Sequence, residues 1–497
     1  MFASFRCLST AWLISCLFIT PLFAQTFSAP KRYGTFTDAF QMVAAGFDRN
    51  GAADLVGVAN LNNGSETSVV VYMNTGRGTF NNPITIAGTT GATAVAVGDF
   101  NQDGNLDIAF TLSTAAQVGV AYGNGKGGFA TPRLYAVDGL ADSIAVGDYD
   151  DDGKPDIATL SDASKRVTIL RNTGQSFIRH SFTVPLYYSS TNAGYPPDTV
   201  SGLVSGDFNG NHQTDLAYLD RCADISCGPG LSRIYSLMNA HSTITPYLVP
   251  NQIGGNATLS AADVDLDGKA DLLVSAVGNG FGEAYVEYSN GGGSFTQVYL
   301  NDDRTSAGLP NTLLVGDFNS DGIEDVATYT DTDAAGNPDY GFDIYTGKGG
   351  RSGFNAPAHF ADNTNVSLRG GFAAGFLNAD GTRDVALIDG TSLAVFLNTT
   401  STAKDPCAYP SGTGLHNCGP RNGGSGPASI QVLDAYKASA QPALRIEFWA
   451  DGHKLFQEYG DLLNTTWTLS AGTHHLSVVG VDATGKYIKS NTTYTAE

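Results

Sequence analysis

Short apolar runs, each followed by a compact acidic segment, recur along most of the chain. One such unit begins with small apolar residues at 143–146, continues through an acidic segment at 148–156 and returns to an apolar run at 157–160. Two further runs, 166–171 and 177–184, are separated by an Asn-Thr-Gly turn. Each run has the length of a β-strand, so the unit predicts four antiparallel strands.

The acidic segment recurs seven times, at intervals of about 55 residues, which is the size of a propeller blade. Units one to seven are marked by the last aspartate of this segment: Asp54, Asp107, Asp156, Asp215, Asp271, Asp325 and Asp384. A single four-stranded sheet cannot bury its own apolar faces, so neighbouring units must pack against one another. The sequence therefore predicts an all-β fold, a seven-bladed β-propeller over residues 25–398.

The two ends of the repeat region predict how the ring closes. The seventh unit stops after its third strand, at residues 396–398, whereas residues 27–33 match the fourth-strand pattern and precede unit one. Pairing these two segments would remove two exposed sheet edges. We therefore expect the N-terminal strand to complete the last blade.

The repeat pattern ends after residue 398. Residues 399–427 are rich in Gly, Pro, Ser and Thr, which is typical of a linker. Alternating runs such as 444–449 and 475–481, with turns between them, then predict strands. We expect a small immunoglobulin-like (Ig-like) β-sandwich over residues 428–497.

The first 24 residues resemble a cleavable secretory signal, with an apolar stretch at 11–20 and a small residue before Gln25. Residues 13–16 also fit a lipoprotein cleavage box, which would leave Cys16 lipid-anchored. No other stretch approaches the length of a membrane span. We expect a secreted, extracellular protein, with anchoring at Cys16 as the alternative.

Removal of the signal would leave four cysteines in an oxidising compartment. Because the cysteines are close together in sequence, the simplest disulfides are Cys222 with Cys227 and Cys407 with Cys418. Neither pair has the spacing and further ligands of a zinc site. We expect the two disulfides to hold loops in place.

The chain is acidic, with 48 Asp and Glu against 27 Lys and Arg and a formal net charge of -21. Such a balance disfavours binding to nucleic acid, which requires clustered basic residues. The acidity has two interpretations: it serves solubility, or many of the carboxylates are metal ligands. The spacing within the acidic segments decides between them.

In unit two, oxygen-bearing side chains occupy every second position from Asp99 to Asp107. This alternation lets the oxygens converge as the chain curls, while Gly104 allows the backbone angle that aims the next carbonyl inward. Oxygen donors without His or Cys suit Ca²⁺, and Mg²⁺ less well. The predicted calcium ligands in the complete loops are Asp99, Asn101, Asp103, Asn105 and Asp107; Asp148, Asp150, Asp152, Lys154 and Asp156; Asp263, Asp265, Asp267, Lys269 and Asp271; and Asp317, Asn319, Asp321, Ile323 and Asp325.

Three units depart from this pattern. Unit four has His212 in place of the glycine, which predicts a weaker site, and its ligands would be Asp207, Asn209, Asn211 and Asp215. Units one and seven have Gly46 and Phe376 at the first ligand position and are interpreted as loops without metal. Asp, Asn and Gly also make good turns, but four complete loops at the same place favour metal. We expect about four to five structural calcium ions.

The motif GDFNxDGxxD, in seven units with a strand supplied by the N-terminus, resembles the FG-GAP or VCBS repeat propellers. This architecture is found in the head of integrin α subunits and in many bacterial secreted proteins. The resemblance covers residues 27–398 and is strongest in units two, three, five and six. It implies calcium in the loop between the first and second strands of a blade. The C-terminal part is similar to Ig-like domains of bacterial secreted proteins.

The longest irregular segments, 187–202, 220–233 and 331–339, are expected on the face opposite the calcium loops. Loops on a rigid scaffold commonly carry binding sites. Tyr187, Tyr188 and Tyr195, beside the disulfide at residues 222–227, would suit stacking on a sugar or a peptide. The alternative is that these segments are tolerated insertions.

We expect an extracellular binding or adhesion module for a glycan or protein partner, and an enzyme is not favoured. No GxSxG, HExxH or phosphate-loop motif is present in the sequence. A propeller-based lyase or glycosidase acting on polysaccharide and a purely structural surface protein remain as alternatives, because fold does not fix function.

Overall fold

The structure is a computed structural model in which most of the repeat region and the C-terminal strands are described. The described residues are 25–34, 39–48, 50, 52–61, 66–186, 198–211, 213–221, 232–238, 245–249, 256–265, 267–278, 281–300, 312–319, 323–332, 338–362, 371–378, 382–389, 392–400, 414–419, 424–426, 429–437, 443–450, 453–459, 462–468, 472–482 and 487–496. They contain strands, turns and bends but no helix. Among them, therefore, no helix is long and apolar enough to cross a membrane.

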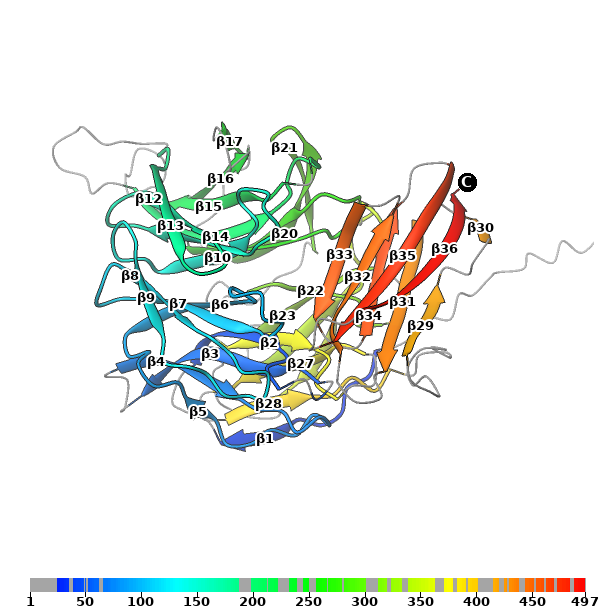
Figure 1. Cartoon of the computed structure of the whole chain (residues 1–497), viewed down its shortest axis with the longest axis horizontal. Helices are drawn as coiled ribbons and strands as arrows, with labels where there is room; N and C mark the ends of the chain where they lie inside the picture. Colours follow the sequence, from blue (N-terminus) through cyan, green and yellow to red (C-terminus); the bar gives the residue numbers. More distant parts are fainter. Residues whose placement is uncertain are drawn as a thin grey trace, which may run out of the picture.

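The repeat region forms seven four-stranded antiparallel sheets in the described residues (Figure 1). Units one to three form β2 (Ala39–Ala45), β3 (Asp54–Leu61), β4 (Glu66–Tyr72) and β5 (Ile84–Thr85); β6 (Ala92–Gly98), β7 (Asp107–Leu112), β8 (Gln117–Ala121) and β9 (Arg133–Ala136); and β10 (Ser143–Gly147), β11 (Asp156–Ser161), β12 (Arg166–Asn172) and β13 (Phe177–Thr183). Units four and five form β14 (Thr199–Gly206), β15 (Asp215–Arg221), β16 (Ser232–Met238) and β17 (Thr245–Leu248); and β18 (Asn256–Ala262), β19 (Asp271–Gly278), β20 (Phe281–Gly291) and β21 (Ser294–Tyr299). Units six and seven form β22 (Leu314–Gly316), β23 (Asp325–Thr332), β24 (Pro338–Tyr345) and β25 (Ala358–Ala361); and β26 (Phe372–Gly375), β27 (Asp384–Ile388), β28 (Ser392–Phe396) and β1 (Lys31–Gly34).

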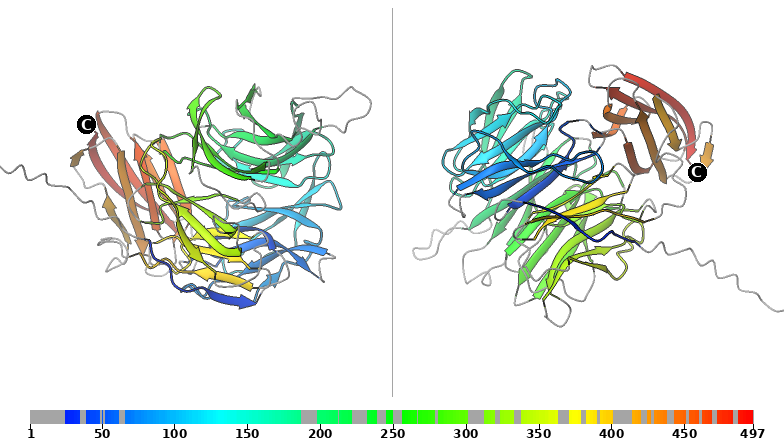
Figure 2. Two further views of the ribbon diagram at one scale, coloured as in Figure 1. Left: turned by 180° about the vertical axis from the view of Figure 1, so that it is seen from behind. Right: turned by 90° about the horizontal axis from the view of Figure 1, so that it is seen from below.

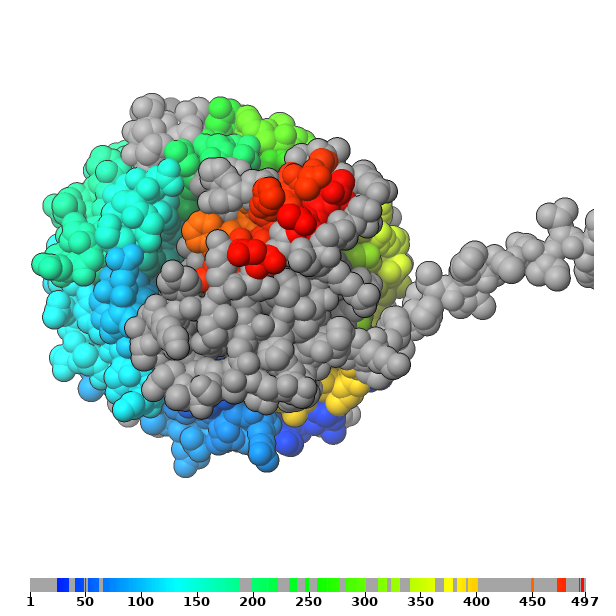
Figure 3. Space-filling model, turned by 45° about the vertical axis from the view of Figure 1, so that its right-hand side comes forward, coloured from blue at the N-terminus to red at the C-terminus, as the bar shows by residue number. Residues whose placement is uncertain are grey.

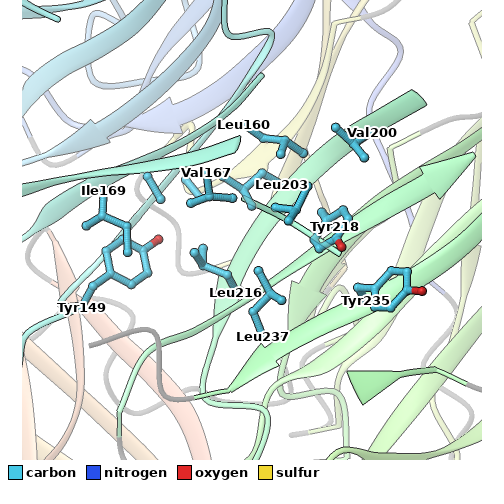
Figure 4. Close-up of a cluster of buried hydrophobic side chains, with 13 residues drawn as sticks. Tyr149, Leu160, Val167, Ile169, Val200, Leu203, Leu216, Tyr218, Tyr235 and Leu237 are labelled. Carbon is cyan, nitrogen blue, oxygen red and sulfur yellow. The ribbon is translucent and has the colours of Figure 1, made fainter. Parts of the chain in front are cut away.

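Each sheet packs on the next around a closed ring. Every pair of neighbouring units shares a hydrophobic cluster, and the last of these clusters joins unit seven to unit one. Between units three and four, for example, Leu160 and Val167 meet Leu216 and Leu237 (Figure 4). The successive sheets follow one another around the ring (Figures 2 and 3). The all-β class and the propeller expected from the repeats are confirmed.

The position of a strand within its sheet decides its exposure. The second strands β7, β11 and β27 are buried along their whole length. The fourth strands β9 and β25 are largely exposed. A second strand is covered on both faces by neighbouring sheets, which explains why it has a continuous apolar run in place of strict alternation.

Strand β1 closes the ring. It pairs antiparallel with β28, from Lys31 opposite Val395 to Gly34 opposite Ser392. Farther along, the N–H of Ser28 donates to the carbonyl of Leu397 (2.8 Å). The expectation that the N-terminal strand completes the last sheet is confirmed.

A partly buried ionic contact reinforces this closure. The Nε of Arg32 in β1 donates to Oδ2 of Asp389 in unit seven (2.9 Å). Its Nη2 also contacts the carboxylate of Asp362, at the end of unit six. One cation therefore links β1 to units six and seven of the ring.

The C-terminal strands form two sheets in the described residues. One has the order β29 (Gly414–Gly419), β31 (Ser429–Lys437) and β34 (Leu462–Thr468). The other has the order β30 (Gly424–Gly426), β36 (Tyr487–Ala496), β35 (Gly472–Asp482), β32 (Ala443–Ala450) and β33 (His453–Tyr459). Phe448, Leu476 and Val478 are buried. Strands β29 and β30 lie within residues 399–427, so strand structure begins inside the segment with linker-like composition.

Candidate metal centres

The acidic segments are loops that join the first strand of each sheet to the second. The loop of unit three, for instance, runs from the end of β10 to Asp156, the first residue of β11. The corresponding connection is β6 to β7 in unit two and β18 to β19 in unit five. Because the connection is the same in every unit, all the acidic loops lie at one end of their sheets.

The last aspartate of each loop, the terminal aspartate, is fully buried, and in six of the seven units it accepts two backbone hydrogen bonds. Its Oδ2 accepts the N–H of the second loop residue in all seven units, at 2.7 to 3.1 Å. Its Oδ1 accepts an N–H from the end of the third strand in six units, at 2.6 to 2.9 Å. The paired donors are Phe47 and Asn74 for Asp54, Phe100 and Gly123 for Asp107, Tyr149 and Asn172 for Asp156, Val264 and Ser289 for Asp271, Phe318 and Gly347 for Asp325, and Leu377 and Asn398 for Asp384.

These bonds give the terminal aspartate a structural role that does not require a metal ion. Units one and seven, where no metal is expected, use Asp54 and Asp384 in the same way as the complete loops. Burial raises the pKa of Asp54 to about 7, and the N–H donors only partly offset this effect. The sequence marked the terminal aspartate only as a ligand, because its backbone partners lie on another strand.

In units one, three and seven, the asparagine at the end of the third strand also ties the unit to the preceding one. The Nδ2 of Asn172 in unit three donates to the carbonyl of Phe100 in the loop of unit two (2.7 Å). In the same way, Asn398 reaches the carbonyl of Phe318 (2.7 Å), and Asn74 reaches that of Leu377 (2.6 Å). An acidic loop is therefore held by its own sheet and by the next one.

The loop of unit three is wound around its first aspartate. Asp148 accepts the N–H of Asp152 on Oδ1 (3.1 Å) and that of Gly153 on Oδ2 (2.7 Å). The loop passes through positive φ at Asp151 (62°) and Gly153 (81°). Glycine adopts this conformation without a steric penalty, which explains its place after the third acidic position. Unit two repeats the two hydrogen bonds to Asp99, at 3.1 and 2.9 Å.

Three carboxylates converge in the loop of unit three. Asp148, Asp150 and Asp156 each offer an oxygen, and these oxygens lie within 4.8 Å of one another. Oδ1 of Asp150 is buried and has no hydrogen-bond partner. Burial, followed by the charge of Asp152, raises the pKa of Asp150. A buried carboxylate oxygen without a partner costs free energy unless a cation compensates it.

Unit five has the same residue types as unit three at every predicted ligand position, but a different environment. Asp263, Asp265 and Asp267 bring oxygens within 4.8 Å of one another. Burial raises the pKa of Asp263 to about 7. An arginine of the next unit, Arg351, lies against this loop and donates to Asp265 and Asp267. Sequence reasoning missed Arg351, and the available signal was a basic residue in the turn after the third strand of unit six.

The remaining predicted ligands are only partly described. In unit four, Asp207 accepts N–H groups of Gly210 (2.7 Å) and Asn211 (3.1 Å), while Asn209 donates its Nδ2 to Asp215 (3.0 Å). Two predicted positions, His212 and, in unit six, Asp321, lie outside the described residues.

The side chains named for the predicted ligand-binding face lie outside the part of the chain that the structure describes. Tyr187, Tyr188, Tyr195, Cys222, Cys227 and Cys407 lie outside the described residues, and of Cys418 only the backbone, in β29, is described. The tyrosine site and the two disulfides therefore stay predictions.

Comparison with known proteins gives one repeat-family match and several matches to solved structures. A family model described as an FG-GAP-like repeat matches residues 46–110, from the acidic loop of unit one to the second strand of unit two. No curated protein matches the chain.

Among solved structures, the Dos1 propeller has a TM-score of 0.43 and 8% identity, over 74% of this chain and 95% of that chain. The Vibrio cholerae biofilm matrix protein Bap1 has a TM-score of 0.34 and 11% identity, over 94% and 76%. The Aleuria aurantia lectin, solved with Fucalpha1-6GlcNAc, has a TM-score of 0.37 and 11% identity, over 67% and 99%.

Proposed function

We propose that this protein is a secreted, calcium-binding, seven-bladed β-propeller that acts as an extracellular binding or adhesion module for a glycan or protein ligand. A single observation carries the calcium part of the proposal: Asp150 holds a buried oxygen without a hydrogen-bond partner, in a loop where three carboxylates converge. In this interpretation calcium stabilises the scaffold, and the ligand binds to loops at the other end of the sheets.

The distances in unit three suit one calcium ion. Calcium binds oxygen ligands at about 2.3–2.6 Å, so two oxygens of one site lie at most about 5 Å apart. The oxygens of Asp148, Asp150 and Asp156 satisfy this limit, at 4.8 Å or less. The donor set contains only oxygen, which favours a hard cation, and calcium tolerates the irregular geometry of a loop better than magnesium does. The predicted ligands in units two, five and six would bind in the same way.

Calcium would connect the acidic loop to bonds that cross between sheets. In unit three, Asp156 is proposed as a ligand, and it already accepts the N–H of Asn172, whose amide reaches unit two. An ion at this loop would therefore stabilise both the sheet and its neighbour. The domain arrangement proposed with it is a signal peptide at 1–24, the propeller at 25–398, a linker at 399–427 that also supplies β29 and β30, and an Ig-like sandwich at 428–497.

Thermal denaturation with and without calcium tests the metal. If one site has a dissociation constant of about 0.1 mM, calcium at 10 mM stabilises the folded protein by about 2.7 kcal/mol per site. We expect the melting temperature to rise on addition of calcium and to fall when a chelator is added. Unchanged melting in both conditions would show that the loops are turns only.

A glycan-array screen of the calcium-loaded protein, repeated in chelator, tests the binding function. We expect binding to a restricted set of glycans, weakened in chelator because the scaffold loosens. Absence of binding in both conditions would reject the glycan ligand and leave a protein ligand, to be sought by binding to extracellular extracts. The metal result is independent of this outcome.

A further inference from the structure

The turn between β24 and β25 places a cation on the acidic loop of the neighbouring unit. Arg351, in this turn of unit six, donates its Nε to Oδ2 of Asp265 (2.5 Å). Its Nη2 donates to Oδ2 of Asp267 (3.0 Å). Asp265 and Asp267 are two of the predicted calcium ligands of unit five.

Three further contacts fix the guanidinium in this position. Its Nη2 donates to the carbonyl of Ser289 (2.5 Å), and its Nη1 contacts the side chain of Asn290. The central guanidinium carbon lies 5.6 Å from the ring centroid of Tyr288. A planar guanidinium suits this combination of carboxylates, carbonyl and aromatic ring better than an ammonium group would. Arg351 is therefore held by several groups of unit five and not by one surface ion pair.

The contact removes Asp265 from solvent. The side chain of Asp265 is 4% exposed, whereas that of Arg351 is 31% exposed. Asp267 is also paired with Lys269 of its own loop (2.6 Å). Two cations of the protein thus compensate the charge that a metal ion would otherwise balance.

The loop of unit three has a different arrangement, in which the charge of Arg171, on the third strand of the same unit, only partly offsets the raised pKa of Asp150. Its residue types match those of unit five at all predicted ligand positions. Asp150, which corresponds to Asp265, retains a buried oxygen without a partner. The converging oxygens also differ, since they include the buried Asp156 in unit three and the more exposed Asp267 in unit five.

We propose that Arg351 is an intramolecular counter-ion that competes with calcium for Asp265 and Asp267. Unit five is then stabilised without metal and binds calcium more weakly than unit three. This inference rests on the proposed calcium binding, and it divides two loops of the same residue types into one that depends on calcium and one that does not. Arg351 also joins units five and six, so the counter-ion takes over the stabilising role proposed for calcium elsewhere in the ring.

The first test measures stability in chelator. Arg351→Gln should lower the melting temperature, because Asp265 then keeps a buried charge without its main partner. Lys348→Gln is the matched control, since Lys348 is an exposed cation in the same turn and its removal changes the net charge equally. Equal melting of the two variants would overturn the counter-ion role.

The second test measures calcium binding by isothermal titration. Because charge-assisted hydrogen bonds must be broken before calcium binds, Arg351→Gln should tighten one site about tenfold or more. Addition of Asp265→Asn in the same chain should abolish that gain, which assigns it to unit five. Arg351→Lys should behave closer to Arg351→Gln than to the unsubstituted protein, because an ammonium group cannot donate to both carboxylates with the planar geometry of the guanidinium.

The outcomes separate this inference from the proposal on which it rests. Calcium binding by the unsubstituted protein with the same affinities in Arg351→Gln overturns the competition alone. No calcium binding by either protein overturns the proposed calcium scaffold, and the competition with it. A gain in affinity that survives Asp265→Asn would place the effect outside unit five and also overturn the inference.

Discussion

Units one and three share a buried terminal aspartate but differ in the rest of the loop. In unit three, Asp150 keeps an oxygen without a partner. In unit one the side chain of Asn50 bridges the loop: its Nδ2 donates to the carbonyl of Asn74 (2.6 Å) and to Oδ2 of Asp48 (3.1 Å), and its Oδ1 accepts the N–H of Ala52 (3.0 Å). The comparison shows that one motif contains two separable parts, a hydrogen-bonded anchor present in every unit and a carboxylate cluster present in some.

Removal of the anchor should have the largest effect. Asp54→Ala leaves the buried N–H groups of Phe47 and Asn74 without their acceptor, which we expect to cost about 3 kcal/mol of unfolding free energy. The loss should be the same in calcium and in chelator, as measured by denaturant unfolding. Asp142→Asn, on an exposed side chain, is the control. A loss that appears only in calcium would make Asp54 a metal ligand and abolish the distinction between the units.

The stability cost of Asp54→Ala should also depend on pH, because burial raises the pKa of Asp54. The pKa of Asp54 is about 7 in the folded protein, above its ordinary value of 3.8. The folded protein therefore binds this proton more tightly than the unfolded chain, and the contribution of Asp54 to stability falls as the pH rises from about 4 to about 7. Unfolding at pH 5 and pH 8 should show a larger cost of Asp54→Ala at pH 5. An equal cost at both values would show that the carboxylate is not perturbed.

The bond between units should have a smaller effect. Asn172→Ala removes the side-chain hydrogen bonds to the carbonyls of Phe100 (2.7 Å) and Pro155 (3.0 Å), while its backbone N–H still serves Asp156. We expect a loss of about 2 kcal/mol in chelator, and a smaller loss in calcium because the ion would hold the same loop. Thermal denaturation under both conditions gives the two values. If Asn172→Ala loses the same stability in calcium and in chelator, the proposed ion does not hold the loop that this hydrogen bond holds.

A substitution in the carboxylate cluster should behave in the opposite way, with a loss of stability in calcium and none in chelator. Asp150→Asn keeps the shape of the side chain and removes a buried charge, so stability in chelator should be unchanged or slightly higher. In calcium, the variant should lose the stabilisation from one site, about 1 to 3 kcal/mol. Melting in a calcium titration measures both effects. If the variant gains as much from calcium as the unsubstituted protein does, Asp150 is not a ligand.

The sequence predicted the parts of the structure that each unit specifies within itself. Strand order, the acidic loops and their glycines all lie within one repeat, and seven repeats make the pattern unambiguous. The N-terminal strand was also predictable, since the fourth strand missing from unit seven had one matching segment at residues 27–33.

The sequence could not predict contacts that depend on a neighbouring unit. Arg351 lies 86 residues after Asp265, and a basic residue in the turn of unit six does not by itself indicate which acidic residue it pairs with. The hydrogen-bonded anchor was not predicted for a related reason. Asp156 receives its second hydrogen bond from Asn172, which lies on another strand. Oxygen-bearing residues at alternate positions look the same whether they accept N–H groups, an arginine or a metal ion. Only their neighbours in space distinguish these three cases.

The position of β1 sets an order of events during synthesis. Arg32 and its partner Asp389 are 357 residues apart. Strand β1 is therefore made before the other strands of the ring but can pair with β28 only after the whole ring has been made. At about 5 to 20 residues per second, roughly 20 to 70 s pass between the synthesis of the two residues. During that time the growing chain has two unpaired sheet edges, each able to accept a strand from another molecule. The chain is therefore most exposed to pairing with another molecule in the interval before the seventh sheet receives β1.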